Sequence, residues 1–170
     1  MAEPLTLYKL IILYMLKKVD FPLTNAQITD FMLDHEYTTY FTLQQALSEL
    51  LESELIRVET ISHTSQYRLT EAGAETLEYF SHMISRPIQE DIDAYLADNK
   101  LKLRNEVSVL ADYYKTNGNE FAVHFRVKEK ANDLIDLTLT VPLEDQAKAM
   151  CSSWHKKCQQ IYAYLMEELM

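Results

Sequence analysis

The chain is poor in residues that interrupt regular structure or cross-link it. Its 170 residues include two glycines, four prolines and two cysteines. This scarcity excludes a collagen-like or low-complexity chain and favours an ordered, helix-rich protein. Two cysteines, Cys151 and Cys158, do not make a disulfide framework. On one helix their Cα atoms would lie about 10 Å apart, which is too far for a bridge.

Basic residues are also scarce. Lysine and arginine number 16 against 26 aspartates and glutamates, so the formal net charge is −10. Residues 1–85 hold five basic and twelve acidic residues, a balance of −7. Phosphate neutralisation supplies most non-specific affinity for nucleic acid, and this overall charge has the wrong sign for it. A nucleic-acid function must therefore rest on local charge and on motifs.

The sequence also lacks membrane and catalytic signals. The apolar run at residues 5–16 is interrupted by Lys9, has no basic flank, and is shorter than the roughly 20 residues that span a bilayer. There is no glycine-rich phosphate loop and no nucleophile elbow, and the five histidines are scattered. We expect a cytoplasmic protein with no membrane segment, no cofactor and no enzymatic activity.

Helical periodicity dominates the first third of the chain. The expected helices span residues 5–19, 25–35 and 42–53. The first is apolar almost all round, so we expect its own domain and a partner chain to cover it. Thr24 or Asn25 can cap the second helix. A period of two then predicts a hairpin with strands at residues 55–61 and 66–70.

The remaining chain predicts a small α+β module. Thr70 is expected to cap a helix that runs to about residue 85, and a further helix begins at Pro87. Three strands are expected next, at residues 107–114, 121–127 and 134–141, and they form a three-stranded antiparallel meander. A long C-terminal helix follows at residues 143–170. We divide the chain into residues 1–73 and residues 74–170, the second being a dimerisation or sensor module.

Two segments resemble a known family. Residues 42–58, TLQQALSELLESELIRV, resemble the third helix and first wing strand of bacterial winged-helix repressors. Residues 67–73, YRLTEAG, resemble the Y-x-L-T-x-x-G exit from their wing. The whole chain is similar to an uncharacterised winged-helix family of clostridia and their relatives. It departs from the repressor pattern at Glu54, where glycine usually ends the third helix in a left-handed conformation, and in a third helix without lysine or arginine.

The resemblance implies a fold and a function. The fold is an N-terminal winged helix-turn-helix over residues 1–73, and the function is that of a transcriptional regulator that binds double-stranded DNA as a homodimer. The alternative is a winged helix that binds another protein and not DNA. The sequence names neither an operator nor a small-molecule or protein effector.

The same resemblance indicates the residues that contact DNA. If the leucines of the third helix face the core, its short polar and amide side chains face outward and can reach base edges. The candidates on this helix are Thr42, Gln44, Gln45 and Ser48. The candidates on the wing are Arg57, His63 and Arg68. Alternatively, both arginines are solvated or pair with Glu59.

One cluster near the C-terminus has two interpretations. Cys151, His155 and Cys158 recur at i, i+4 and i+7, so they share a helical face and could offer ligands to zinc. Trp154 and Ile161 lie on the same stripe, which favours a core or dimer seam where cysteine acts as a small hydrophobic residue. We expect these three side chains to pack in such a core or dimer seam and to bind no metal.

Overall fold

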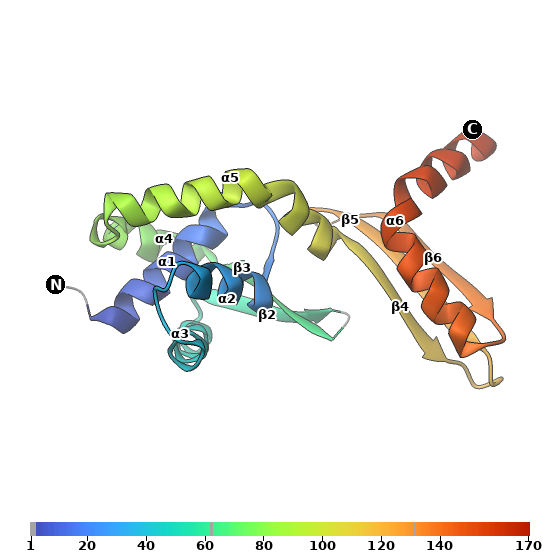
Figure 1. The fold of residues 1–170 in the computed structure, drawn as a ribbon, viewed down its shortest axis with the longest axis horizontal. Coiled ribbons are helices and arrows are strands. Elements are labelled where there is room, and N and C mark those ends of the chain that lie inside the picture. The colour runs from blue at the N-terminus through green and yellow to red at the C-terminus, as the bar shows by residue number, and fades with distance from the viewer. Residues whose placement is uncertain (1–2, 62, 131) are drawn as a thin grey trace. The chain divides into compact units, whose positions relative to one another are not determined.

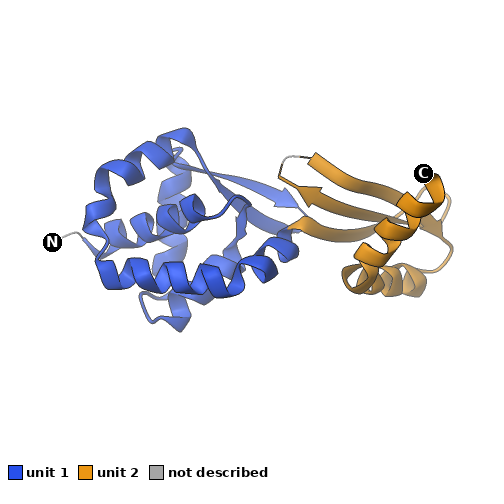
Figure 2. Ribbon diagram, turned by 90° about the horizontal axis from the view of Figure 1, so that it is seen from above, with its two compact units in different colours: residues 1–107 blue, residues 108–170 orange. Residues whose placement is uncertain are grey.

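The computed structural model describes residues 3–61, 63–130 and 132–170. Over these residues the chain is an α+β protein with six α-helices and two antiparallel three-stranded sheets (Figure 1). It divides into two compact units, residues 1–107 and residues 108–170 (Figure 2). Within the described ranges, no helix combines the length and apolar character needed to cross a membrane.

The first unit is mostly helical. Its elements are α1 (Pro4–Lys18), β1 (Leu23–Thr24), α2 (Asn25–Asp34), α3 (Tyr40–Glu52), β2 (Ile56–Ile61), β3 (Thr64–Leu69), α4 (Glu71–Phe80), the 3₁₀ turn η1 (Ser81–Met83) and α5 (Arg86–Ser108). Thr24 caps α2 and Thr70 caps α4, as the sequence predicts. Both threonines accept a backbone N–H from the first turn of their helix, which satisfies a donor that would otherwise lack a partner.

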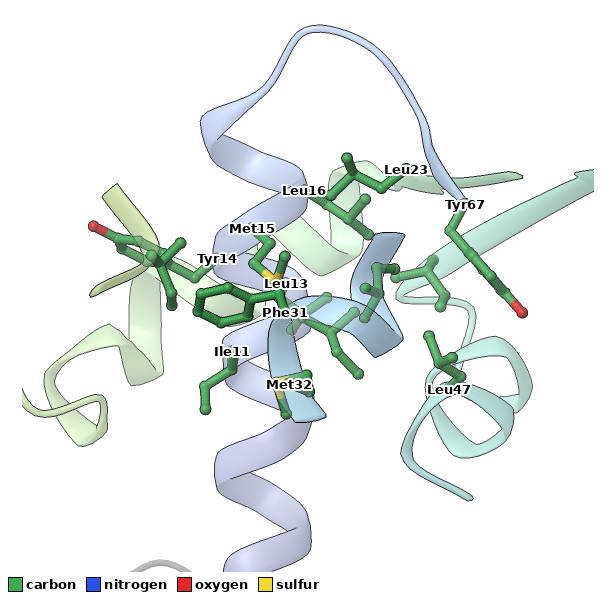
Figure 3. Packing of buried hydrophobic residues seen from close by; sticks show 14 of the residues in the cluster. Ile11, Leu13, Tyr14, Met15, Leu16, Leu23, Phe31, Met32, Leu47 and Tyr67 are labelled. Atoms are coloured by element: carbon green, nitrogen blue, oxygen red, sulfur yellow. The ribbon is translucent and has the colours of Figure 1, made fainter. Parts of the chain in front are cut away.

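Helix α1 is the centre of this unit. Residues 10–16 are all buried, although they point in every direction around the helix. Phe31 and Met32 of α2, Leu47 of α3 and Tyr67 of β3 pack around it (Figure 3). The chain itself covers residues 10–16, and contact of this helix with a partner chain stays a prediction.

Helices α4 and α5 belong to the same core. Leu77 of α4 and Ile92, Leu96 and Leu103 of α5 are buried in the cluster that surrounds α1. The Tyr14 hydroxyl also donates to Asp93 at 3.0 Å. The packing therefore ends this unit at residue 107, whereas the division at residue 73 marks the end of the winged-helix pattern in the sequence.

The first sheet differs from the two-stranded wing expected from the sequence. Strand β1 pairs with β3, so the order is β1-β3-β2 and the strands do not follow one another as in a simple meander. Leu23 lies opposite Tyr67, and both are buried. A two-residue strand cannot show a period of two, which is why the sequence pattern did not reveal it.

The second unit is a sheet covered by one helix. Strands β4 (Val109–Lys115), β5 (Phe121–Glu129) and β6 (Asn132–Val141) form an antiparallel sheet in the order β4-β5-β6, with an irregular register after Val127. Helix α6 (Glu144–Leu169) packs on all three strands. Trp154 is buried against Phe125, with ring centroids 5.0 Å apart, and its indole N–H donates to the Arg126 carbonyl at 3.4 Å.

Candidate nucleic-acid interface

Helix α3 has one buried face and one exposed face. The hydroxyl of its N-cap, Thr39, accepts the Thr42 amide at 3.4 Å and donates to the Thr42 hydroxyl at 3.0 Å. The buried face consists of Leu43, Ala46, Leu47 and Leu50. The opposite face repeats at i, i+4, i+7 and i+11. We call it the α3 stripe, and it consists of Phe41, Gln45, Ser48 and Glu52, all exposed.

Phe41 is the member of the α3 stripe that sequence reasoning missed. Its exposed fraction is 83%, and its closest aromatic neighbour is Tyr40, with ring centroids 5.8 Å apart. The third helix is predicted from residue 42, so Phe41 falls just outside it. The helix in fact begins at Tyr40. The spacing could have placed Phe41 on the exposed face, because it precedes Gln45 by about one helical turn.

Gln44 faces the protein rather than solvent. Its amide makes a reciprocal pair with Asn25: Asn25 Nδ2 donates to Gln44 Oε1 at 2.8 Å, and Gln44 Nε2 donates to Asn25 Oδ1 at 3.0 Å. Asn25 also donates to the Tyr67 hydroxyl at 3.3 Å and accepts from Thr29 at 3.1 Å. This group of hydrogen bonds joins α3 to the start of α2 and to β3.

The end of α3 fixes where the β2–β3 hairpin begins. Leu55 N–H donates to the Leu50 carbonyl at 3.0 Å, and Glu54 N–H donates to the Leu51 carbonyl at 3.1 Å. These two bonds make a Schellman motif, which needs a left-handed residue between the helix and Leu55. Glu54 supplies it, with φ of 58°. Residue 54 therefore has the left-handed conformation of the repressor pattern, although it is glutamate and not glycine.

The Y-x-L-T-x-x-G segment joins α4 to this same turn. Thr70 donates its hydroxyl to the Glu54 carbonyl at 2.8 Å, and its amide donates to the Leu55 carbonyl at 3.2 Å. A Cβ on Gly73 would lie 2.0 Å from that Leu55 oxygen, so only glycine allows the approach. The chain is held at both ends of the hairpin, which orients the wing relative to α3.

The β2–β3 hairpin, the wing of the sequence prediction, carries two adjacent positive charges. Arg57 of β2 lies directly opposite Arg68 of β3, and both side chains are exposed. Glu59 lies opposite Gln66, not opposite an arginine. Among the described residues, neither Arg57 nor Arg68 forms an ion pair. Of the two alternatives expected from the sequence, pairing with Glu59 is absent, and the exposure of both arginines agrees with solvated side chains.

Carboxylates are confined to the far end of α3. Its first turn has no acidic residue, while Glu49 and Glu52 lie in its second half. The Lys9 ammonium donates to Glu49 Oε1 at 3.1 Å, and this bond holds the pKa of Glu49 below its ordinary value. The first turn of α3 is therefore uncharged, and the β2–β3 hairpin carries Arg57 and Arg68, in a unit that holds more acidic than basic residues.

The comparison with protein families gives one result. The sequence pattern described as "Domain of unknown function (DUF4364)" matches residues 8–169. The chain belongs to the DUF4364 family. No curated protein and no solved structure matches it. Because the DUF4364 match runs through residues 107 and 108, the family pattern includes both compact units.

The structure separates the predicted DNA-binding residues into groups. Gln45 and Ser48 lie on the exposed α3 stripe. Thr42 and Gln44 are half-buried and bonded within the protein. On the wing, Arg57 and Arg68 face each other, and His63 is exposed at the tip with a left-handed φ of 62°.

The cysteine cluster of α6 lies in the second unit. Cys151 and Cys158 are half-buried in the core around Trp154, and His155 is exposed. Burial, and then the negative charge of Asp112, raise the pKa of the Cys151 thiol and so disfavour the thiolate that binds zinc. In the described part of the chain, no three His, Cys, Asp or Glu side chains are placed to hold a metal ion.

Proposed function

We propose that this DUF4364 protein is a cytoplasmic transcriptional regulator that binds double-stranded DNA as a homodimer. In this proposal residues 1–73 are a winged helix-turn-helix, α3 is its recognition helix and the β2–β3 hairpin is its wing. Three helices followed by a hairpin is the order of that domain. The two segments that resemble bacterial winged-helix repressors coincide with α3, β2 and the turn into α4.

The arginine pair of the wing carries the proposal. Like charges directly opposite each other on antiparallel strands destabilise a sheet. Arg57 and Arg68 adopt this arrangement on an exposed surface, and neither forms an ion pair among the described residues. A phosphate group between or beside the guanidinium groups would remove the repulsion through charge-assisted hydrogen bonds.

The α3 stripe supplies the second part of the interface. Gln45 and Ser48 are exposed and carry an amide and a hydroxyl, groups that can read base edges in the major groove. Gln44, with Asn25, positions α3 relative to the wing. Base contacts from the stripe then provide sequence preference, while the arginines provide affinity that does not depend on sequence.

Helix α6 supports the homodimer. Its residues after Trp154 include none that is buried, yet its C-terminal half carries an apolar row that we call the α6 row: Tyr162, Met166 and Leu169. A helix of this length gains most of its stability from packing an apolar face. A second copy of α6 related by a two-fold axis would cover the row on both subunits, and a two-fold dimer can bind two DNA half-sites.

Binding to an unbiased pool of DNA tests the proposed function. Purified protein is incubated with genomic fragments, and the bound fragments are sequenced over several rounds of selection. We expect enrichment of a two-fold symmetric site with half-sites about 10 base pairs apart. The variant that carries Arg57→Gln and Arg68→Gln is the control and should enrich nothing. Fragments bound by wild type without any shared sequence would contradict a regulator that reads DNA.

A protein-binding winged helix is the second candidate. The balance of −7 over residues 1–85 and the exposed ring of Phe41 are features that also suit a protein partner. A pull-down run beside the DNA selection separates the two functions. If wild type enriches no DNA but retains a protein that Phe41→Ala does not retain, the protein-binding function replaces DNA recognition.

A further inference from the structure

The first member of the α3 stripe is a large apolar side chain that the protein leaves mostly in solvent. Phe41 leaves 83% of its surface exposed, and fully burying a phenylalanine side chain is worth about 1.5–3 kcal/mol. Its ring touches Tyr40, which is itself half exposed. The buried face of α3 lies on the opposite side of the helix, so no rotation of the side chain returns it to the core.

We propose that Phe41 contacts the C5-methyl group of thymine in the major groove, an inference that rests on the proposed DNA-binding function. The thymine methyl is the apolar group that base pairs present in that groove, and phenylalanine is one of the side chains that contact it. The site recognised by the protein then carries thymine opposite the start of α3. Phe41 acts there as a specificity residue.

The charges of α3 itself do not oppose the approach of a DNA backbone to Phe41. The first turn of α3 holds no carboxylate, so its N-terminal dipole is not cancelled near Phe41. Both carboxylates of the helix lie beyond Gln45, and Lys9 pairs with Glu49. The ring, the Gln45 amide and the Ser48 hydroxyl enter the groove without moving a charge out of water.

Helical geometry gives the position of the thymine. Phe41 and Gln45 are four residues apart on one face, a rise of about 6 Å. Base pairs of DNA rise about 3.4 Å, so the two side chains contact bases roughly two steps apart. The selected site should therefore hold a thymine about two base pairs from the base that changes when Gln45 is replaced.

Replacing thymine by deoxyuridine tests this contact directly, because the change removes the methyl group and leaves the hydrogen-bonding edges intact. Affinity is measured by fluorescence anisotropy for the selected duplex and for duplexes with single uracils. We expect wild type to lose about fourfold per half-site at one position, the value of one buried methyl group. Phe41→Ala should bind the thymine duplex about as weakly as wild type binds the uracil duplex, and should not distinguish the two.

Matched controls separate the contact from general effects. Tyr79→Ala removes an equally exposed aromatic side chain from α4 and should keep the full thymine preference. Phe41→Leu keeps an apolar side chain at this position and should keep most of the preference for thymine over uracil. Sequence-specific binding that is indifferent to uracil at every position overturns the contact and leaves the proposed function standing. Absence of DNA binding by wild type overturns both.

Discussion

Glu54 shows how a single backbone conformation is maintained by a residue that does not favour it. Its φ of 58° lies in the left-handed region, which disfavours residues with a Cβ by about 1–2 kcal/mol. Glycine removes that strain but loses more conformational freedom on folding. We predict that Glu54→Gly stabilises the protein by about 0.5–1 kcal/mol, measured by urea unfolding.

Glu36 is the internal comparison for this prediction. It ends α2 with the same two bonds, Glu36 N–H to the Leu33 carbonyl and Tyr37 N–H to the Met32 carbonyl, and its φ is 55°. Glu36→Gly should give a similar gain, whereas Gln45→Gly inside α3 should destabilise the protein by about 0.5 kcal/mol. A loss of stability in Glu54→Gly would contradict this prediction and would show that the Glu54 side chain itself stabilises the protein.

Gly73 is required for a close approach rather than for a turn. A Cβ there would lie 2.0 Å from the Leu55 carbonyl oxygen and 2.8 Å from Leu69 Cδ1. We predict that Gly73→Ala destabilises the protein by about 3 kcal/mol, because α4 must move away from the turn that begins the wing. Gly118→Ala is the control, since its added Cβ meets no atom nearer than 3.9 Å. Equal unfolding midpoints for the two variants would refute the close approach.

At the scale of elements, the two amides of α3 have different roles. Gln44→Ala breaks the reciprocal pair with Asn25 and leaves polar atoms of that residue without their partner, so we predict a loss of about 1–3 kcal/mol of stability. Gln45→Ala changes an exposed side chain and should alter stability by less than about 0.5 kcal/mol. For DNA, Gln45→Ala should relax sequence preference at one base pair. Urea unfolding of both variants checks the first expectation, and equal stability would contradict it.

The sequence predicts the elements of this protein better than their contacts. Periodicity identifies α2, α3 and the wing strands to within about two residues, because their apolar repeats are long and regular. Asn117–Gly118 is a dipeptide typical of tight hairpin turns and lies between β4 and β5, although the left-handed residue there is Asn119. The pairing of Gln44 with Asn25 could not be predicted, because it joins residues 19 positions apart through tertiary packing. The position opposite Arg57 depends on register, which the sequence leaves open between two polar strands.

At the scale of the whole molecule, the exposed α6 row leads to a testable prediction about assembly. The α6 row is exposed in one chain, whereas residues 10–16 of α1 are already covered. We expect a homodimer of twice 19.9 kDa in sedimentation velocity at micromolar concentration. The double substitution Tyr162→Lys with Met166→Lys should shift it to monomer without unfolding it.

Gln160→Lys is the matched control for this assembly. It adds a charge to an exposed position of α6 on a different side from the α6 row, and it should leave the dimer intact. A wild-type monomer would contradict the two-fold assembly. A dimer that resists the double substitution would place the interface elsewhere in the molecule.

The salt dependence of DNA binding tests the central claim most directly. Affinity for a selected duplex and a scrambled duplex is measured by fluorescence anisotropy at several salt concentrations. If Arg57 of each subunit contacts one phosphate, Arg57→Gln removes two contacts per dimer and should flatten the slope of log affinity against log salt by roughly 1.8. Arg68→Gln should do the same, and both variants should weaken the two duplexes alike. Equal and negligible binding of wild type to both duplexes at low salt would contradict DNA recognition by this protein.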